Sequence, residues 1–285
     1  MNGMLVVNKP SNCTSRDVVN IICKKFNTKK VGHTGTLDPM ATGVLIVLIG
    51  KYTNLVEVIT ACDKIYEAEI TLGTSTDTLD ITGNILKEEN TKVNLNEIKS
   101  VLNSMIGTYE QEVPKYSAVK INGKKLYDYA RNNKDIELPK RLVEIKSLEL
   151  ISDIKYKNNK TIFKIRTCVS KGTYIRSLIN DISKKLNTIG VMSELKRIKQ
   201  GNIDISESYS VDEILNDKYS FYNINNCFED IFTVDMDENL YKKIKNGVQL
   251  KNTYGKGTIL FKYDGNNIAI YKNDKNILKM WKYLL

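Results

Sequence analysis

The residue whose type and surroundings most favour chemistry is Asp38, within the glycine-containing segment 31–45. Gly32 and Gly35 allow close approach of the backbone, and Pro39 restrains the chain directly after the carboxylate. A carboxylate at the end of a loop, just before an apolar run, can be held rigidly and partly desolvated, which suits nucleophilic or general-base catalysis. Judged on this segment alone, an Asp–Pro turn with an ordinary solvated carboxylate is the simpler interpretation.

Two further positions could act together with such a carboxylate. Arg176 follows Gly172 at the start of a predicted helix, where its guanidinium could pair with a carboxylate and keep it ionised. Tyr66 lies on a predicted strand, and its ring could stack on a nucleic-acid base. Each has a simpler interpretation when taken alone, namely a surface arginine and a core or cross-strand tyrosine.

The segment from Pro114 to Arg131 mixes basic and aromatic residues, which is the composition of a surface that contacts phosphates and bases. The whole chain has a formal net charge of +10 and an isoelectric point of about 9.1. A phosphate backbone is the commonest partner of a basic domain. A lysine-rich solvated surface explains the same charge, so composition alone leaves both interpretations open.

The cysteines and the single histidine exclude several classes of site. The five cysteines are widely spaced and contain no C-x-x-C pair, so neither a zinc site nor a disulfide framework is predicted. One histidine, His33, excludes multi-histidine metal centres. The N-terminus has no signal-peptide pattern, and the longest apolar run, 44–49, is too short to span a membrane. We therefore expect a cytoplasmic protein without a metal or a membrane anchor.

A mixture of strands and helices must position these residues. Apolar patterns predict strands over residues 4–7, 43–49, 65–72, 141–151 and 161–169, and helices over 15–26, 53–61, 94–107 and 174–186. Residues 32–39 are predicted to form a loop. Because the strands and helices do not alternate regularly, the prediction is an α+β fold with a mixed, largely antiparallel sheet flanked by helices.

The pattern changes near residue 230. A short helix over residues 237–246 and two strands over 257–263 and 267–271 predict a small β-rich module. We therefore expect a larger domain over residues 1–229 and a small C-terminal domain over 230–285. Both are basic, which is compatible with one RNA touching both.

Five segments carry a pattern that is specific when they are taken together. They are residues 7–10 (Val-Asn-Lys-Pro), 32–45 (beginning Gly-His-Thr-Gly-Thr-Leu-Asp-Pro), 76–80 (Thr-Asp-Thr-Leu-Asp), 115–120 (Lys-Tyr-Ser-Ala-Val-Lys) and 170–178 (Ser-Lys-Gly-Thr-Tyr-Ile-Arg-Ser-Leu). In this order they resemble the bacterial TruB family of tRNA pseudouridine synthases. The joint match, from about residue 3 to residue 200, outweighs the simpler interpretation of each segment alone.

The resemblance implies a pseudouridine synthase catalytic domain followed by a small PUA-like RNA-binding domain. Such enzymes isomerise uridine 55 in the T-loop of tRNA without cofactor or metal: the C1′–N1 bond breaks, the base turns, and a C1′–C5 bond forms. Carried to this chain, the resemblance makes Asp38 the catalytic carboxylate, Arg176 its ion-pair partner and Tyr66 the tyrosine that stacks on the base. Whether Asp38 attacks C6, attacks C1′ or removes a ribose proton stays open.

The resemblance also implies residues around the substrate. Tyr174 and Leu195 would line the uracil pocket, which receives a base extruded from its stack at a cost of a few kcal/mol. His33 would contact the space that the base leaves in the RNA, with orientation of its own loop as the alternative. Asp80 would support the catalytic arginine, and Lys9 would hold the loop beneath the site.

Residues 108–139 would form the RNA-gripping insertion of the family. Its candidate phosphate contacts are Lys120, Lys124, Lys125 and Arg131. The expected partner is the T-arm and elbow of tRNA, bound by a monomer that needs no other protein.

One position departs from the family pattern. Asn12 stands where the family usually has a glycine, two residues after the Lys9-Pro10 pair. Asparagine is the residue that, after glycine, most readily adopts a positive φ. The departure therefore bears on the geometry of this local turn and not on the predicted function.

Two alternatives predict different behaviour. A guide-RNA-dependent synthase would share Asp38, Tyr66 and Arg176 but would need partner proteins, and the Lys- and Tyr-rich insertion favours the stand-alone type. An RNA-folding chaperone with an inactive site predicts that Asp38→Ala changes neither RNA binding nor activity. The presence of all the expected catalytic residues disfavours the chaperone.

Overall fold

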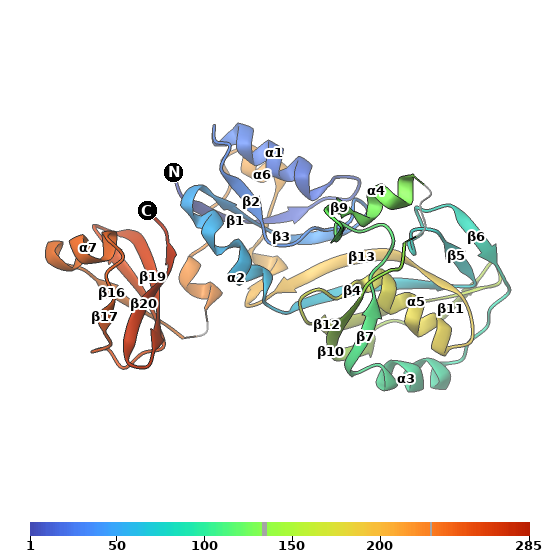
Figure 1. Cartoon of the computed structure of the whole chain (residues 1–285). Coiled ribbons are helices and arrows are strands. Elements are labelled where there is room, and N and C mark those ends of the chain that lie inside the picture. The colour runs from blue at the N-terminus through green and yellow to red at the C-terminus, as the bar shows by residue number, and fades with distance from the viewer. Residues whose placement is uncertain (133–135, 229) are drawn as a thin grey trace. The chain divides into compact units, whose positions relative to one another are not determined.

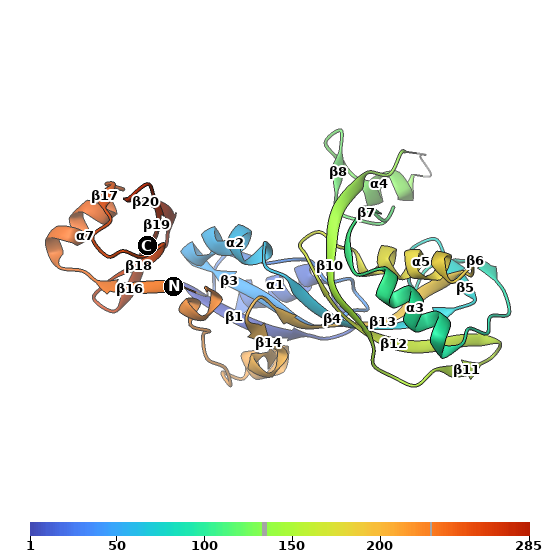
Figure 2. The same cartoon turned by 90° about the horizontal axis from the view of Figure 1, so that it is seen from below.

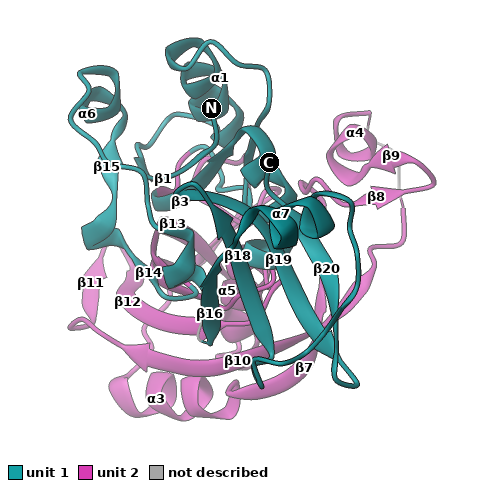
Figure 3. Ribbon diagram, turned by 90° about the vertical axis from the view of Figure 1, so that its left-hand side faces the viewer, with its two compact units in different colours: residues 1–39, 43–60, 201–285 teal, residues 40–42, 61–200 magenta. Residues whose placement is uncertain are grey.

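The computed structural model describes residues 1–132, 136–228 and 230–285, and contacts between Cα atoms divide the chain into two units (Figure 3). Unit 1 contains residues 1–39, 43–60 and 201–285, and unit 2 contains residues 40–42 and 61–200. The first and last parts of the chain belong to the same unit because they share a hydrophobic core, in which Met4 and Ile46 cluster with Leu260 and Leu284. The expected domain boundary after residue 229 stays a prediction.

The main sheet of unit 2 pairs neighbouring strands antiparallel (Figure 1). In spatial order its strands are β13 (Gly190–Gln200), β4 (Lys64–Leu72), β12 (Lys160–Val169), β10 (Lys140–Leu150) and β7 (Gly107–Glu112), with β11 (Lys155–Lys157) paired to β12. Every second residue of β4 is buried, as its alternating sequence predicts. The sequence pattern does not predict β13 or β7.

Two helices, α3 (Leu95–Ser104) and α5 (Ile175–Lys185), lie side by side on this sheet (Figures 1 and 2). Helix α3 begins as predicted, because the Asn94 side chain accepts a hydrogen bond from the Glu97 N–H and the Glu97 carboxylate accepts one from the backbone N–H of Asn94. It ends before Gly107, where β7 begins. Between β4 and α3 the chain forms a hairpin of β5 (Thr74–Thr76) and β6 (Ile85–Glu88).

In unit 1, β1 (Gly3–Lys9) pairs antiparallel with β3 (Thr42–Ile49) and parallel with β15 (Tyr209–Ser210). Helix α1 (Ser15–Lys25) is capped by Thr14, whose side chain accepts from the Asp17 N–H. Two expectations change in detail. The predicted helix over 53–61 is a 3₁₀ turn (Gly50–Leu55) followed by α2 (Val56–Thr60), and the beginning of the predicted loop is the short strand β2 (Val31–His33), paired to β3.

The end of unit 1 is a five-stranded sheet with its own apolar cluster, which includes Phe261 and Tyr271. Its strands, in spatial order, are β16 (Ile231–Asp235), β18 (Thr258–Tyr263), β19 (Asn266–Asp274), β20 (Ile277–Tyr283) and β17 (Leu250–Lys251), accompanied by α7 (Glu238–Lys245). The α+β class with mixed, largely antiparallel sheets and a small β-rich, PUA-like C-terminal part is confirmed. Within the described residues, no helix is both long and apolar enough to cross a membrane.

Candidate functional site

In unit 1, a buried lysine holds the peptide that follows Asp38. The side chain of Lys9 is fully buried at the end of β1, and its ammonium donates to the carbonyls of Pro10 at 2.7 Å, Cys13 at 2.5 Å and Pro39 at 3.2 Å. A buried charge is tolerated only when such polar partners surround it. Lys9 therefore ties the residue directly after Asp38 to the end of a core strand.

The residue before Asp38 is held equally firmly. The N–H of Leu37 donates to Ser15 Oγ at 2.9 Å, and this hydroxyl is 3.3 Å from the Leu37 carbonyl oxygen, to which it donates in turn. Leu37 is buried, and Ser15 is the first residue of α1. Asp38, itself partly buried, thus lies between two residues that other elements fix in place.

The structure shows the turn at the position that departs from the family pattern. Asn12 has a φ of +57°, so asparagine takes the conformation for which glycine is otherwise preferred. In the same unit, His33 ends β2, with Val47 opposite it on β3, and is partly buried. Its position five residues before Asp38 places it at the start of the same loop.

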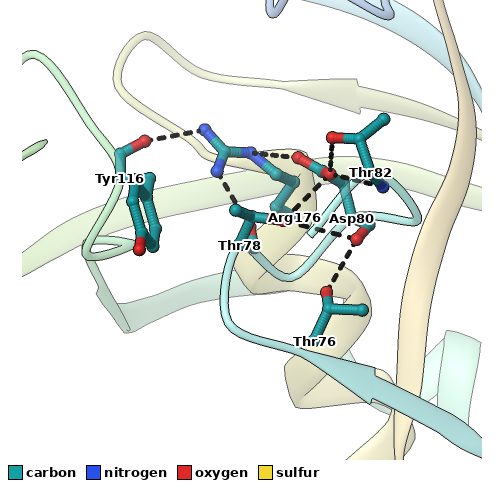
Figure 4. Close-up of polar contacts among 6 residues, drawn as sticks. All are labelled: Thr76, Thr78, Asp80, Thr82, Tyr116 and Arg176. Atoms are coloured by element: carbon teal, nitrogen blue, oxygen red, sulfur yellow. Dashed lines mark hydrogen bonds and ion pairs between the residues drawn. The ribbon is translucent and has the colours of Figure 1, made fainter. Parts of the chain in front are cut away.

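In unit 2, backbone carbonyls and a carboxylate hold the guanidinium of Arg176 (Figure 4). Nη1 donates to the Thr78 carbonyl at 2.9 Å, Nη2 donates to the Tyr116 carbonyl at 3.1 Å, and Nε lies 3.9 Å from Asp80 Oδ2. Arg176 is 5% exposed although it lies in the first turn of α5. It is therefore not the surface arginine of the simpler interpretation.

Hydrogen bonds from three threonines of the same loop orient Asp80 (Figure 4). Asp80 Oδ1 accepts from Thr78 Oγ1 at 2.9 Å, from the Thr82 N–H at 3.0 Å and from Thr82 Oγ1 at 2.6 Å, while Thr76 Oγ1 donates to the Asp80 carbonyl at 2.7 Å. Leu79, between Thr78 and Asp80, has a φ of +64°. A non-glycine residue in this region carries strain, which the surrounding hydrogen bonds must outweigh. The backbone is thereby shaped to present the Thr78 carbonyl to Arg176.

The predicted base-stacking tyrosine lies next to a buried arginine that no sequence motif indicates. Tyr66 on β4 is opposite Arg197 on β13, and its hydroxyl is 3.5 Å from Arg197 Nη1. Arg197 is 1% exposed, two residues after Leu195, which is also buried. Burial, and next the charge of Arg197, lower the pKa of nearby Lys64 to about 8. The only feature of the sequence that marks Arg197 is its spacing of two from Leu195 on one strand.

The predicted insertion forms a small hairpin and a helix. Strands β8 (Lys120–Ile121) and β9 (Lys124–Lys125) meet at a turn, and α4 (Leu126–Arg131) follows. The side chains of Lys120 and Lys124 are exposed. Lys125 Nζ and the Arg131 guanidinium carbon lie 5.1 and 5.4 Å from the centre of the Tyr127 ring. Residues 133–135 of the predicted insertion fall outside the described residues.

The predicted residues thus divide between the two units. Lys9, His33 and Asp38 belong to unit 1. The other group, in unit 2, contains Tyr66, Asp80, Tyr174, Arg176 and Leu195. The pairing of Asp38 with Arg176 involves both units and stays a prediction. Within residues 1–132, 136–228 and 230–285, no group of three or more His, Cys, Asp or Glu side chains is placed to hold a metal ion.

Comparison with known proteins gives consistent matches along the chain. Residues 23–175 match the model of the family described as "TruB family pseudouridylate synthase (N terminal domain)". The chain is 42% identical over 289 residues to the tRNA pseudouridine synthase B of Acholeplasma laidlawii, with all of both chains covered, and 38% identical to that of Bacillus subtilis, with 100% and 98% covered. A solved Cbf5–Nop10–Gar1 complex contains a chain of the same fold, with a TM-score of 0.71 at 21% identity over 99% of this chain and 85% of that one.

Proposed function

Because this chain belongs to the TruB family of pseudouridylate synthases, we propose that it isomerises uridine 55 in the T-loop of tRNA. The observation that carries the proposal is the full-length similarity to proteins named tRNA pseudouridine synthase B. Hydrogen bonds to Leu37 and Pro39, the two neighbours of Asp38, add to it. In the reaction the C1′–N1 bond breaks, the uracil turns, C1′ joins C5, the proton on C5 leaves, and N1 takes up a proton. No atom is added or removed overall, so the reaction is an isomerisation.

Asp38 is the catalytic carboxylate in this proposal. The contacts of Lys9 and Ser15 to its two neighbours support the role, because a catalytic group contributes most when its position is set before the substrate arrives. Held in this way, a carboxylate loses little conformational freedom when it acts on C6, on C1′ or on a ribose proton.

Arg176 is proposed to pair with Asp38 and keep it ionised, since a neighbouring positive charge favours the carboxylate form. The carbonyls of Thr78 and Tyr116 and the carboxylate of Asp80 support this role because they hold the guanidinium plane on several sides. A planar fork bound in this way cannot be replaced by the single ammonium of lysine.

The remaining site residues are proposed to bind the flipped base and its surroundings. Tyr66 would stack on the uracil, and Tyr174 and Leu195 would line its pocket. Tyr66 is buried on β4, and so is Leu195 on the neighbouring strand β13, where it lies opposite Ala68. This burial supports an apolar pocket wall there. His33 would contact the space that the base leaves in the T-loop.

We propose that the insertion grips the RNA backbone through Lys120, Lys124, Lys125 and Arg131. The exposure of Lys120 and Lys124 and the net charge of +10 support contacts to phosphates. Such an enzyme would act in the cytoplasm as a monomer, without cofactor, metal or obligate protein partner, and would hold the T-arm and elbow of tRNA.

The test is tritium release from a tRNA transcript labelled at uridine C5, with purified protein and no added partner. We expect one equivalent to be released from the wild-type tRNA, none when position 55 is cytidine, and none from Asp38→Asn protein that still binds tRNA. Release only after addition of a guide RNA and partner proteins would support the guide-dependent alternative. Tight tRNA binding without release under any condition would instead favour the chaperone.

A further inference from the structure

One side-chain amide joins strand β7 to the first turn of α5. Gln111 on β7 is 1% exposed. Its Oε1 accepts from the Tyr174 N–H at 2.8 Å, and its Nε2 donates to the Tyr174 carbonyl at 3.2 Å. A single side chain thus satisfies both backbone groups of one residue, in the manner of a hydrogen-bonded pair between antiparallel strands.

The residue that Gln111 holds is the one that starts the helix. Tyr174 is the N-cap of α5, with an extended backbone (φ −100°, ψ 116°) and no capping hydrogen bond from its own side chain. Helix starts usually depend on a local polar side chain to fix the entry of the chain. Here Gln111, 63 residues away in the sequence, supplies this restraint.

Two further contacts extend the same junction along α5. Gln111 Nε2 also donates to the Tyr109 hydroxyl at 2.7 Å, and this hydroxyl lies 3.3 Å from Asp181 Oδ2, to which it donates. Burial raises the pKa of Tyr109, so the donor proton is retained at neutral pH. In addition, Ser177 Oγ donates to the Glu112 carbonyl at 2.8 Å. Strand β7 therefore restrains α5 on both sides of Arg176.

The chain that continues from β7 also holds the guanidinium itself. Arg176 Nη2 donates to the carbonyl of Tyr116, four residues after the end of β7 (Figure 4). The segment 109–116 thus fixes both the backbone turn that carries Arg176 and one side of its guanidinium. The same segment leads directly into the hairpin and helix that carry Lys120, Lys124 and Arg131.

We propose that Gln111 is a positioning residue for the isomerisation: it fixes the first turn of α5, and with it the Tyr174 ring and the Arg176 guanidinium, to the strand from which the RNA-gripping insertion departs. Its effect on catalysis rests on the function proposed above. Gln111 does not touch the substrate, so it acts on the turnover step more than on the affinity for tRNA. RNA bound by the insertion would therefore contact a segment that continues directly from β7, the strand that positions Arg176.

The first test is Gln111→Met, which keeps nearly the same volume but cannot form the three hydrogen bonds. We expect kcat to fall at least tenfold, equivalent to about 1.4 kcal/mol of activation free energy, while KM for tRNA changes less than threefold. Hydrogen exchange of the amides in residues 174–176 should become at least tenfold faster. The matched control is Thr161→Val, which removes a buried hydroxyl that donates to the Thr91 carbonyl at 2.8 Å and should leave kcat unchanged.

The second test is Gln111→Glu, whose response to pH separates positioning from general loss of stability. A neutral carboxyl can accept from the Tyr174 N–H and donate to the Tyr174 carbonyl, whereas a carboxylate can only accept. The ratio of variant to wild-type kcat should therefore fall as pH rises from about 6 to 8, at a temperature where both proteins are folded. If Gln111 only stabilised the fold, or if only its volume mattered, the ratio of variant to wild-type kcat would not change with pH.

The outcomes separate this inference from the proposed function. Wild-type kcat in Gln111→Met, or unchanged exchange at 174–176, would overturn the positioning role even if the enzyme acts on tRNA as proposed. If the wild-type protein releases no tritium, the proposed function fails, and the exchange comparison alone then decides whether Gln111 fixes the turn. Should Gln111→Met fail to fold, the pH dependence of Gln111→Glu decides the question.

Discussion

Replacing Asp80 by asparagine removes one charge from the arginine network and almost no volume. The three hydrogen bonds that Asp80 Oδ1 accepts from Thr78 and Thr82 can persist, because the asparagine carbonyl oxygen takes the same position. The amide nitrogen then faces Arg176 Nε, where a carboxylate oxygen lies at 3.9 Å in the wild type. A donor thus meets a donor, and the guanidinium loses its acidic partner.

The expected magnitude follows from the geometry. Two unit charges 3.9 Å apart attract by about 4 kcal/mol at an effective dielectric constant of about 20. Breaking a buried pair typically costs about 3–5 kcal/mol, and the side chains of Arg176 and Asp80 are only 6% and 8% exposed. Because the carbonyls of Thr78 and Tyr116 still accept from the guanidinium, we expect the free energy of unfolding to fall by about 2–3 kcal/mol. A guanidinium turned from its place should lower kcat by about 100-fold, about 2.7 kcal/mol of activation free energy.

Urea unfolding gives the stability, and tritium release under single-turnover conditions gives the rate. The matched control is Asp77→Asn in the same loop, since Asp77 accepts from the backbone N–H and side-chain amide of Asn84 at 2.8 and 3.0 Å on the exposed side. This control should lose less than about 1 kcal/mol of stability and keep its kcat. Full stability and full activity in Asp80→Asn would refute the view that this carboxylate holds Arg176 in the position proposed for catalysis.

Three further predictions concern other parts of the chain. The double variant Lys120→Gln, Lys124→Gln should bind tRNA more weakly and should reduce the steepness of log K against log salt concentration by roughly 1.5. Filter binding between about 50 and 200 mM salt measures this, and an unchanged slope would exclude the two lysines as phosphate contacts. Asn12→Ala should lower the free energy of unfolding by about 1 kcal/mol, since φ is +57° there, while Asn12→Gly should not. Burial raises the pKa of Asp181, so the contribution of this residue to stability falls as the pH rises through the raised value. Relative to the wild type, Asp181→Asn should therefore gain stability as the pH rises from about 4, the ordinary pKa of aspartate, to about 7. A difference in denaturation midpoint that stays constant over this range would contradict the prediction.

Elements that depend on neighbours in the sequence were predictable. The alternation of β4, the cap of α3 at Asn94 and the positive φ of Asn12 all follow from interactions within a few residues. Strand β13 was not predicted, because Arg197 occupies a buried position that an apolar residue would normally fill. A charged residue facing inward breaks the alternation by which a half-buried strand is recognised.

The sequence by itself indicated the family to which the chain belongs and the residues that are candidates for catalysis. Its motifs predicted Asp38, Tyr66 and Arg176 as site residues, and the support of the arginine by Asp80. Only the tertiary structure decided that Arg176 is also held by the carbonyls of Thr78 and Tyr116, 98 and 60 residues away.

The reason lies in the chemistry of those acceptors. Every residue carries a backbone carbonyl, so no letter of the sequence marks the two that bind the guanidinium. The same holds for the Tyr174 backbone groups that Gln111 binds, since a glutamine in a strand has no period or spacing that points to its partner. Contacts between a side chain and a distant backbone are set by how the strands and helices pack, and they become visible only in the folded chain.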